Sequence, residues 1–386
     1  VGCYAPKYNR KAEKTMLKDQ LDKIMRPKSI AVIGASTKPK TIGSEMMQRL
    51  RDYKFQGEIY PINPKAAEIE GFKAYPSVKD VPGNIDFAVL IIPKQFVLET
   101  LAQCNEKGIK GICIISAGFK ETGAEGVALE LELAETLKKY GMRCVGPNCL
   151  GVLNTNDNVR MDATFAEALP EKGNIAFVSQ SGALGGGILN ILKDLNVGFA
   201  QFVSVGNQAD INAETMMEYW EDDADVKQIL LYMESIANPN NFRKLASRIT
   251  KKKPIVALKA GRSAAGASAA SSHTGSLAGA DKAADALLKQ SGVIREFGLK
   301  GLFDTAKVFS NCPIPKGNRV AIITNSGGPG IMATDAICEY GLEMAQISDK
   351  TRETLLSFLP AAASVKNPID MIASAGIDHY SRTLET

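Results

Sequence analysis

The sequence predicts an α/β protein made of several doubly wound units, and three observations support this fold class. From Pro27 onward, short apolar, β-branched runs alternate with longer amphipathic stretches. Continuous apolar strands of this kind are typical of parallel sheets that helices cover on both faces. The strands end in Gly, Pro, Asn or Ser, as strands do where such sheets bind ligands. The length of 386 residues exceeds one ordinary core, so two or more domains are expected.

The first α/β unit is expected at residues 26–150, behind a basic N-terminal extension at residues 1–25. Within the extension, Lys14–Met25 has the spacing of an amphipathic helix. The apolar runs of the unit predict strands at Ser29–Ile33, Glu58–Ile62, Phe87–Ile92, Gly111–Ser116 and Arg143–Val145. The stretches between these runs predict helices at Ser44–Tyr53, Phe96–Lys107 and Glu125–Tyr140.

Two further units are expected at residues 151–312 and 313–386, and both begin with a strand, a Ser/Gly turn and a helix. The second unit has predicted strands at Asn174–Val178, Phe199–Val203, Gln228–Met233 and Pro254–Leu258, and a predicted helix at Ala183–Asp194. The third unit begins with a predicted strand at Val320–Thr324. Residues 313–386 are fewer than a doubly wound domain needs, so we expect the third unit to be incomplete.

Composition and charge exclude several classes of protein. Hydrophobic residues make up 45% and charged residues 23%, as in globular proteins. The formal charge of +4, the absence of a dominant basic cluster and the single Trp argue against a nucleic-acid partner. No apolar run approaches the ~18 residues of a membrane span, so no membrane contact is expected. The seven cysteines form no C-x-x-C pair, which predicts reduced thiols and a cytoplasmic protein.

The turn after the first predicted strand indicates a nucleotide site. Residues 34–43, from Gly34 to Gly43, are mostly small, so the backbone can approach a phosphate at the start of the next helix. The second strand ends at Lys65, where a dinucleotide site of the NAD type has an acidic residue. A lysine there suits a phosphorylated ribose, as in CoA or NADP. The simpler interpretation is a packing turn and a solvated lysine.

The second candidate site is a histidine in a loop of small residues. His273 lies in residues 261–279, a run of mainly Ala, Ser and Gly; the only other histidine, His379, has no motif around it. Imidazole is a good nucleophile at neutral pH, and a loop could carry a phosphoryl group between two sites. Two Ser/Gly helix starts, at Ser179–Gly182 and Asn325–Gly330, could hold that phosphate. An incidental histidine in a flexible loop is the alternative interpretation.

Four motifs in order resemble the NDP-forming acyl-CoA synthetase superfamily, and the layout is most similar to its ADP-forming acetate–CoA ligase alpha subunits. The motifs are Gly146-Pro-Asn-Cys-Leu-Gly151, Val178-Ser-Gln-Ser-Gly182, Ser271-Ser-His-Thr-Gly-Ser276 and Asn367-Pro-Ile-Asp370. The resemblance implies a Rossmann-like CoA-binding domain followed by flavodoxin-like, succinyl-CoA synthetase-like α/β domains. It also implies that acyl-CoA, phosphate and ADP are interconverted with carboxylic acid, CoA and ATP through an acyl phosphate and a phosphohistidine.

The same resemblance implies the roles of individual residues. His273 would be phosphorylated, and Glu234, at a strand end, would orient the imidazole. CoA or acyl-CoA would be bound by Gly34, Ser36, Lys65, Ile115, Ser116 and Ala117, with Asn148 near the thiol end. Phosphate would be bound by Ser179, Gln180, Ser181 and Gly182 and by Ser326, Gly327 and Gly328. No residue of this chain is expected to bind a metal.

The sequence departs from the family pattern in two respects. No ATP-grasp domain, P-loop or acidic metal cluster is recognisable, so ADP or ATP and Mg²⁺ are expected at a partner ATP-grasp subunit or domain in a hetero-oligomer. Gly185-Gly-Gly187 stands where some relatives have a Tyr, which predicts a different acyl pocket. The motifs fit small, branched and aromatic carboxylic acids alike. Three glycines in a helix cost roughly 1 kcal/mol each, which indicates a close approach of substrate or a packing constraint.

Two alternatives stand beside the ligase. The chain could be a non-catalytic acyl-CoA-sensing module of a larger protein, because similar modules without a catalytic histidine exist. An NADP-dependent oxidoreductase would explain the first turn and Lys65, but it would not explain the His273 loop or the Ser/Gly helix starts.

Overall fold

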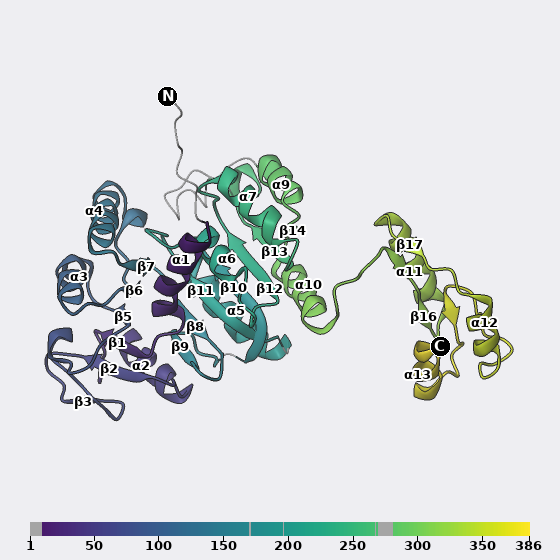
Figure 1. Cartoon of the computed structure of the whole chain (residues 1–386), viewed down its shortest axis with the longest axis horizontal. Helices are drawn as coiled ribbons and strands as arrows, with labels where there is room; N and C mark the ends of the chain where they lie inside the picture. Colours follow the sequence, from purple (N-terminus) through teal and green to yellow (C-terminus); the bar gives the residue numbers. More distant parts are fainter. Residues whose placement is uncertain (1–9, 170, 196, 267, 269–280) are drawn as a thin grey trace. The chain divides into compact units, whose positions relative to one another are not determined.

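The computed structural model describes residues 10–169, 171–195, 197–266, 268 and 281–386. The chain divides into two compact units, Val1–Cys312 and Pro313–Thr386, and each is described by itself (Figure 1).

The first sheet of the larger unit has five parallel strands in the order β2-β1-β5-β6-β7. Its strands are β1 (Ser29–Ile33), β2 (Glu58–Ile62), β5 (Phe87–Leu90), β6 (Gly111–Ile114) and β7 (Arg143–Val145), with a small hairpin of β3 (Glu68–Ile69) and β4 (Phe72–Lys73). The accompanying helices are α1 (Arg10–Met25), α2 (Ile42–Asp52), α3 (Val97–Glu106) and α4 (Ala124–Tyr140), and the short helices η1 (Val78–Asp80), η2 (Lys94–Phe96) and η3 (Lys120–Thr122). The strands and α2–α4 confirm the predicted positions to within two residues.

The second sheet has seven strands in the order β14-β13-β12-β10-β11-β8-β9. Its strands are β8 (Gly151–Asn154), β9 (Met161–Thr164), β10 (Lys172–Ser179), β11 (Phe199–Ser204), β12 (Gln228–Met233), β13 (Ile255–Lys259) and β14 (Ile294–Glu296). Its helices are α5 (Gly182–Leu195), α6 (Ala213–Trp220), α7 (Pro239–Ile249), α9 (Asp281–Gln290) and α10 (Leu299–Asn311). Strands β10–β14 are parallel, whereas the hairpin β8–β9 is antiparallel and was not predicted.

Both sheets have a switch point at which the strand order reverses. In the first sheet β1 lies between β2 and β5, and in the second sheet β10, the first of the parallel strands, lies between β11 and β12. In open α/β sheets, ligands bind beyond the carboxyl ends of the strands at this point. The two predicted Gly/Ser turns follow β1 and β10, so each lies at the switch point of its sheet.

Helix α1 is part of the core. The sequence assigned residues 1–25 to an extension, yet Leu21, Ile24 and Met25 are fully buried. They belong to a hydrophobic cluster that also includes Val32 of the first sheet and Ile229 of the second. The apolar face of the helix therefore packs between the two sheets and gives them a common core.

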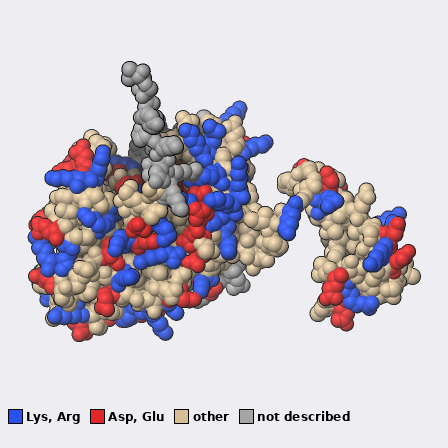
Figure 2. Space-filling model, viewed as in Figure 1, with Lys and Arg blue, Asp and Glu red and all other residues tan. Residues whose placement is uncertain are grey.

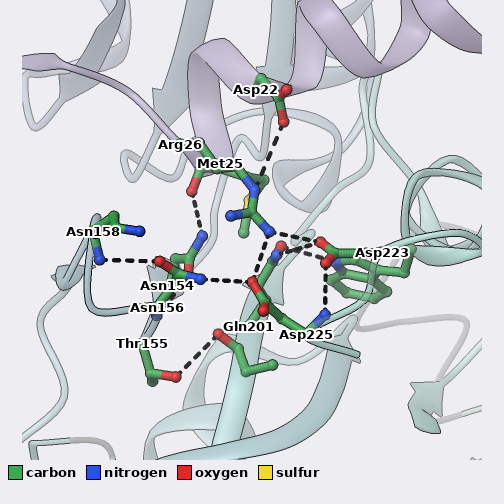
Figure 3. Close-up of polar contacts among 12 residues, drawn as sticks. Asp22, Met25, Arg26, Asn154, Thr155, Asn156, Asn158, Gln201, Asp223 and Asp225 are labelled. Atoms are coloured by element: carbon green, nitrogen blue, oxygen red, sulfur yellow. Dashed lines mark hydrogen bonds and ion pairs between the residues drawn. The ribbon is translucent and has the colours of Figure 1, made fainter. Parts of the chain in front are cut away.

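A polar network fixes the end of α1 against the second sheet (Figure 3). The Arg26 guanidinium donates to Asp223 at 2.9 Å and to Asp225 at 3.0 Å, in the turn between α6 and β12. Asn154, at the end of β8, donates to the carbonyl of Met25 at 2.8 Å.

The network continues inward from Asp223. Gln201 on β11 donates to Asp223 at 3.0 Å and accepts the indole N–H of Trp220 at 2.8 Å. Both Gln201 and Trp220 are fully buried, so each side chain has its polar group satisfied inside the core.

The smaller unit contains two pairs of short parallel strands and three helices among its described residues. The strand pairs are β15 (Arg319–Val320) with β17 (Glu343–Met344) and β16 (Ile323–Thr324) with β18 (Ile369–Asp370). The helices are α11 (Gly327–Glu339), α12 (Asp349–Leu356) and α13 (Ile377–Glu385). The predicted strand at Val320–Thr324 is divided between β15 and β16. The core of this unit is small and includes Leu355, Leu359, Ile369 and Met371.

The surface has a mixed charge. On the face of the larger unit that Figure 2 draws, basic and acidic side chains alternate, as the near balance of 46 basic and 42 acidic residues predicts. Among the helices that the structure describes, none has the length and apolar character to cross a membrane.

Replacing Arg26 with Ala should lower the free energy of unfolding of the larger unit by about 2 kcal/mol, because the substitution leaves Asp223 largely buried without its cation. Trp220 is the only Trp in the chain, so denaturant unfolding can be followed by its fluorescence. Arg243, exposed on α7, is the matched control, and Arg243→Ala should change the stability by less than about 0.5 kcal/mol. Equal stabilities of the two variants would contradict a structural role of the network.

Candidate functional site

The turn after β1 brings three strands of the first sheet together. Gly34 has a φ of 95°, and a Cβ atom there would lie 2.1 Å from the carbonyl oxygen of Ile91, so only glycine fits. The Asn63 side chain donates to Ala35 at 2.8 Å and accepts the backbone N–H of Lys65 at 2.8 Å. These contacts connect the ends of β1, β2 and β5 and leave the Lys65 side chain exposed.

In the turn after β6, Ser116 forms hydrogen bonds through its hydroxyl group and through its backbone carbonyl. Ser116 Oγ donates to the carbonyl of Ile92 and accepts its N–H at 3.2 Å. The Ser116 carbonyl accepts the N–H of Asn148 at 3.0 Å. Asn148 adopts a left-handed conformation with a φ of 57°, which Asn tolerates better than most residues.

A cavity of about 770 Å³ lies between the two sheets of the larger unit. From the first domain it is lined by Ile115, Ser116, Ala117 and Asn148, and from the second by Gln180, Ser181 and Gly182. The structure therefore brings seven of the predicted site residues together. Three others, Gly34, Ser36 and Lys65, lie at the carboxyl end of the first sheet outside the cavity lining.

The turn between β10 and α5 is closed by hydroxyl groups. Ser179 Oγ donates to the carbonyl of Ser181 at 2.7 Å and accepts the N–H of Ser181 at 3.2 Å. Ser181 Oγ accepts the N–H of Leu184 at 3.3 Å in the first turn of α5. The positive end of the helix dipole and further N–H groups lie here, as at anion sites in other proteins.

Gln180 connects this turn to Glu234. Its side-chain oxygen accepts the backbone N–H groups of Glu234 at 2.6 Å and Ser235 at 3.0 Å, and its nitrogen donates to the Ser235 carbonyl at 2.9 Å. Glu234 is buried at the end of β12. A predicted phosphate-binding residue therefore holds the backbone of the predicted orienting carboxylate in place.

The smaller unit contains a turn of the same construction. Thr324 Oγ1 donates to the carbonyl of Ser326 at 2.9 Å and accepts its N–H at 3.0 Å, as Ser179 does for Ser181. Ser326 is the N-cap of α11, whose first residues are Gly327 and Gly328. The two predicted phosphate turns thus share one hydrogen-bond pattern. His273 lies outside the described residues.

The three glycines of α5 have different surroundings. A Cβ atom at Gly185 would lie 2.8 Å from Phe202 Cζ, whereas one at Gly187 would meet no atom of a described residue within 4 Å. Gly186 and Gly187 line the cavity. Both interpretations of the glycine run therefore apply, since Gly185 packs against the core and its neighbours leave space in the cavity.

Several cavity residues were not predicted from the sequence. Two of them are Ile42 at the start of α2 and Lys120 at the start of η3. The others are Phe165, Ala166 and Glu167 after β9, and Gly206, Asn207 and Gln208 after β11. The Gly206-Asn207 pair, three residues after the predicted strand Phe199–Val203, is a local signal that could have identified one of these segments. Among the residues that the structure describes, no group of three or more His, Cys, Asp or Glu side chains could hold a metal ion.

One buried carboxyl lies on the strand that leads into the cavity. Asp162 on β9 has no solvent exposure; its Oδ1 accepts from Thr164, and its Oδ2 has no hydrogen-bond partner among the residues that the structure describes. Burial raises the pKa of Asp162 to about 7, although the Thr164 hydroxyl and the positive charge of Arg49 act in the opposite direction.

Two protein families match the two sheets. Residues 28–155 match the CoA binding domain, and residues 172–309 match the succinyl-CoA ligase like flavodoxin domain.

Similar proteins cover nearly the whole chain. The alpha subunit of the ADP-forming acetate–CoA ligase II of Pyrococcus furiosus is 50% identical over 94% of this chain and 78% of its own length. The ADP-forming acetate–CoA ligase I of Archaeoglobus fulgidus is 43% identical over 95% of this chain, which spans only 52% of that longer protein. A solved structure of the dinucleotide-forming acetyl-coenzyme A synthetase 1 of Ca. Korarchaeum cryptofilum, in complex with phosphate and ADP, has a TM-score of 0.89 and 39% identity over 95% of this chain and 78% of its own.

Gly185→Ala should destabilise the larger unit by about 1–3 kcal/mol, because the added methyl group collides with the Phe202 ring. That ring cannot move freely, since it packs on Phe177 at a centroid distance of 5.5 Å. Gly187→Ala is the matched control, and it should be neutral or stabilise α5 by up to about 1 kcal/mol. Urea unfolding followed by Trp220 fluorescence measures the stability of both variants. A Gly185→Ala variant as stable as the native protein would rule out the packing constraint.

Asp162→Asn should make the stability less dependent on pH. Between about pH 4 and pH 7 only the folded protein keeps the Asp162 proton, so this group lowers the stability as pH rises through that range. Below the range the carboxyl is neutral in both states. The free energy of unfolding of the variant, relative to that of the native protein, should therefore increase with rising pH. The increase should reach up to about 4 kcal/mol at pH 8, since one pKa unit corresponds to about 1.4 kcal/mol.

The measurement is denaturant unfolding at pH 5 and pH 8. Asp157→Asn, at an exposed position of the same hairpin, is the control and should follow the native protein at both pH values. A constant difference between Asp162→Asn and the native protein would contradict the raised pKa.

Proposed function

Because the chain belongs to the family of the ADP-forming acetate–CoA ligase alpha subunits, we propose that it is the CoA-binding and phosphohistidine-carrying part of an acyl-CoA ligase. The observation that carries the proposal is the cavity of about 770 Å³. Its wall combines Ser116 and Asn148 of the CoA-binding domain with the Gln180–Gly182 turn of the second domain. A thioester and a phosphate could therefore meet in one space.

We assign CoA to the first domain. The small residues Gly34 and Ser36 allow the backbone to approach a phosphate, and the exposed Lys65 supplies a positive charge for a phosphorylated ribose. The pantetheine arm would pass Ile115, Ser116 and Ala117, with the thiol near Asn148.

The proposed chemistry consists of two displacements on this chain. A phosphate oxygen attacks the thioester carbonyl carbon, the C–S bond breaks, and CoA leaves, which gives an acyl phosphate. An imidazole nitrogen of His273 then attacks the phosphorus, the P–O bond to the acyl group breaks, and the carboxylate leaves. Glu234 would keep the imidazole oriented and its second nitrogen protonated. The Ser179–Gly182 turn would hold the phosphate. We assign the same role to Ser326, Gly327 and Gly328, because their turn has the same hydrogen-bond pattern.

The remaining step needs a partner. We propose that an ATP-grasp subunit or domain binds ADP and Mg²⁺ and accepts the phosphoryl group from His273, in a hetero-oligomer. The term alpha subunit in the names of the relatives supports a partner. We also place the ligase in the cytoplasm; the buried Cys113 and Cys149 thiols, whose sulfur atoms lie 3.6 Å apart without a bond, are consistent with a reducing compartment.

The chain should become phosphorylated when it is incubated with labelled inorganic phosphate and its cognate acyl-CoA, without nucleotide. The expected label is acid-labile and base-stable, and a panel of acyl-CoAs identifies the acyl group. His273→Ala should abolish the label, because the accepting nitrogen is lost. Glu234→Gln should reduce the initial rate of labelling by roughly tenfold or more, because the imidazole loses its orienting charge.

His379→Ala is the matched control, since His379 is the only other histidine, and it should label as the native chain does. If CoA binds but no acyl-CoA produces a label, either alone or with an ATP-grasp partner, the chain is an acyl-CoA-sensing module and the ligase proposal fails.

A further inference from the structure

Two asparagines from different domains meet at the wall of the cavity. The loop after β11 approaches the Pro147–Asn148 segment so closely that a Cβ atom at Gly206 would lie 2.3 Å from the Pro147 carbonyl oxygen. The backbone N–H of Asn207 donates to that carbonyl at 2.9 Å. The side-chain nitrogen of Asn148 lies 3.3 Å from the side-chain oxygen of Asn207.

The orientation of the Asn207 amide follows from its surroundings. Asn207 is only 6% exposed, and its side-chain nitrogen lies 2.6 Å from Glu121 Oε2 and 2.8 Å from Glu130 Oε2. Ionised carboxylates only accept hydrogen bonds, so the amide nitrogen must face them. The amide oxygen of Asn207 must therefore point the other way, towards Asn148.

Both carboxylates have further polar partners besides Asn207. Burial raises the pKa of Glu121, but hydrogen bonds from the Asn207 amide and from the N–H groups of Gly118 and Phe119 outweigh it and leave the pKa below its ordinary value. Glu130 forms an ion pair with Lys120 at 3.1 Å. Both acceptors are therefore held beside the Asn207 amide by contacts of their own.

The orientation of the Asn207 amide also fixes that of the Asn148 amide. Because the Asn207 oxygen can only accept, Asn148 must present its nitrogen to it, and the Asn148 oxygen Oδ1 is turned away from Asn207. Within the described part of the chain, Asn148 Oδ1 accepts no hydrogen bond, and Asn148 lines the cavity. The site therefore offers an acceptor at this point and needs a ligand that donates.

We propose that Asn148 Oδ1 accepts the thiol hydrogen of CoA, and that Asn207, locked by Glu121 and Glu130, is the positioning residue that selects this orientation. The inference rests on the proposed function, which brings CoA to this cavity. A thiol is a weak donor, whereas an acyl carbonyl oxygen can only accept. The fixed orientation of Asn148 thus favours the free thiol of CoA over the acyl carbonyl oxygen at this point of the cavity. The thiol keeps its proton, because an amide oxygen is not a base.

The test compares the binding of CoA with that of desulfo-CoA, in which hydrogen replaces the thiol group. Calorimetry on the 386-residue chain should give roughly 3- to 10-fold tighter binding of CoA, the effect of one modest hydrogen bond. Asn148→Ala and Asn207→Ala should each reduce this ratio to about 1, whatever their effect on the affinity for desulfo-CoA itself. The double variant should add nothing, because both changes remove the same interaction.

The control is Asn158→Ala, an exposed asparagine in the β8–β9 turn, which should keep the native ratio. If Asn207→Ala does not fold, Asn207→Ser replaces it, since the hydroxyl can donate to one carboxylate but is too short to reach Asn148. The assignment is overturned if the native chain binds CoA and desulfo-CoA equally well. It is also overturned if both Asn207 variants keep the preference of the native chain for CoA. Absence of any CoA binding would instead overturn the proposed function, and this assignment with it.

Discussion

The interaction on which the rest of the structure depends is the attachment of α1 to both sheets. Its apolar face gives the two sheets one core, and its last turn is held by Arg26 through Asp223 and Asp225 (Figure 3). These contacts lie at the amino ends of β1 and β12. The relative orientation of the sheets is set there, and their carboxyl ends enclose the cavity at the opposite side. A helix that the sequence suggests is an appendage therefore helps to determine the geometry of the site.

The cavity itself depends on close contacts between loops. Gly34 and Gly206 each approach a carbonyl oxygen of a neighbouring loop more closely than any side chain would permit. The approach of Gly206 to the Pro147–Asn148 segment places backbone and amide groups at the wall of the cavity. Groups held in this way lose little entropy when a ligand binds, which is the physical benefit of preorganisation.

Much of the site could be predicted because its parts are local. The two phosphate turns each depend on a hydroxyl three residues before the first helical residue, that of Ser179 before Gly182 and that of Thr324 before Gly327, so a short motif identifies both. Asn207 could not be predicted in this way. Its function depends on Asn148, 59 residues away, and on Glu130, 77 residues away. The hairpin β8–β9 was missed because its buried strands contain the polar residues Asn154, Asp162 and Thr164, which interrupt the apolar run that marks the other strands.

The sequence by itself determined the alternation of strands and helices, the two Ser/Gly turns and the family. These features follow from apolar periodicity and from the conformational preferences of Gly, Ser and Asn over a few neighbouring residues. The tertiary structure decided that α1 belongs to the core, that Gly185 is a packing residue, and that Asn148 and Asn207 meet at the wall of the cavity. Each of these depends on contacts between segments far apart in the chain, and no local pattern encodes which buried groups will meet once the two sheets pack.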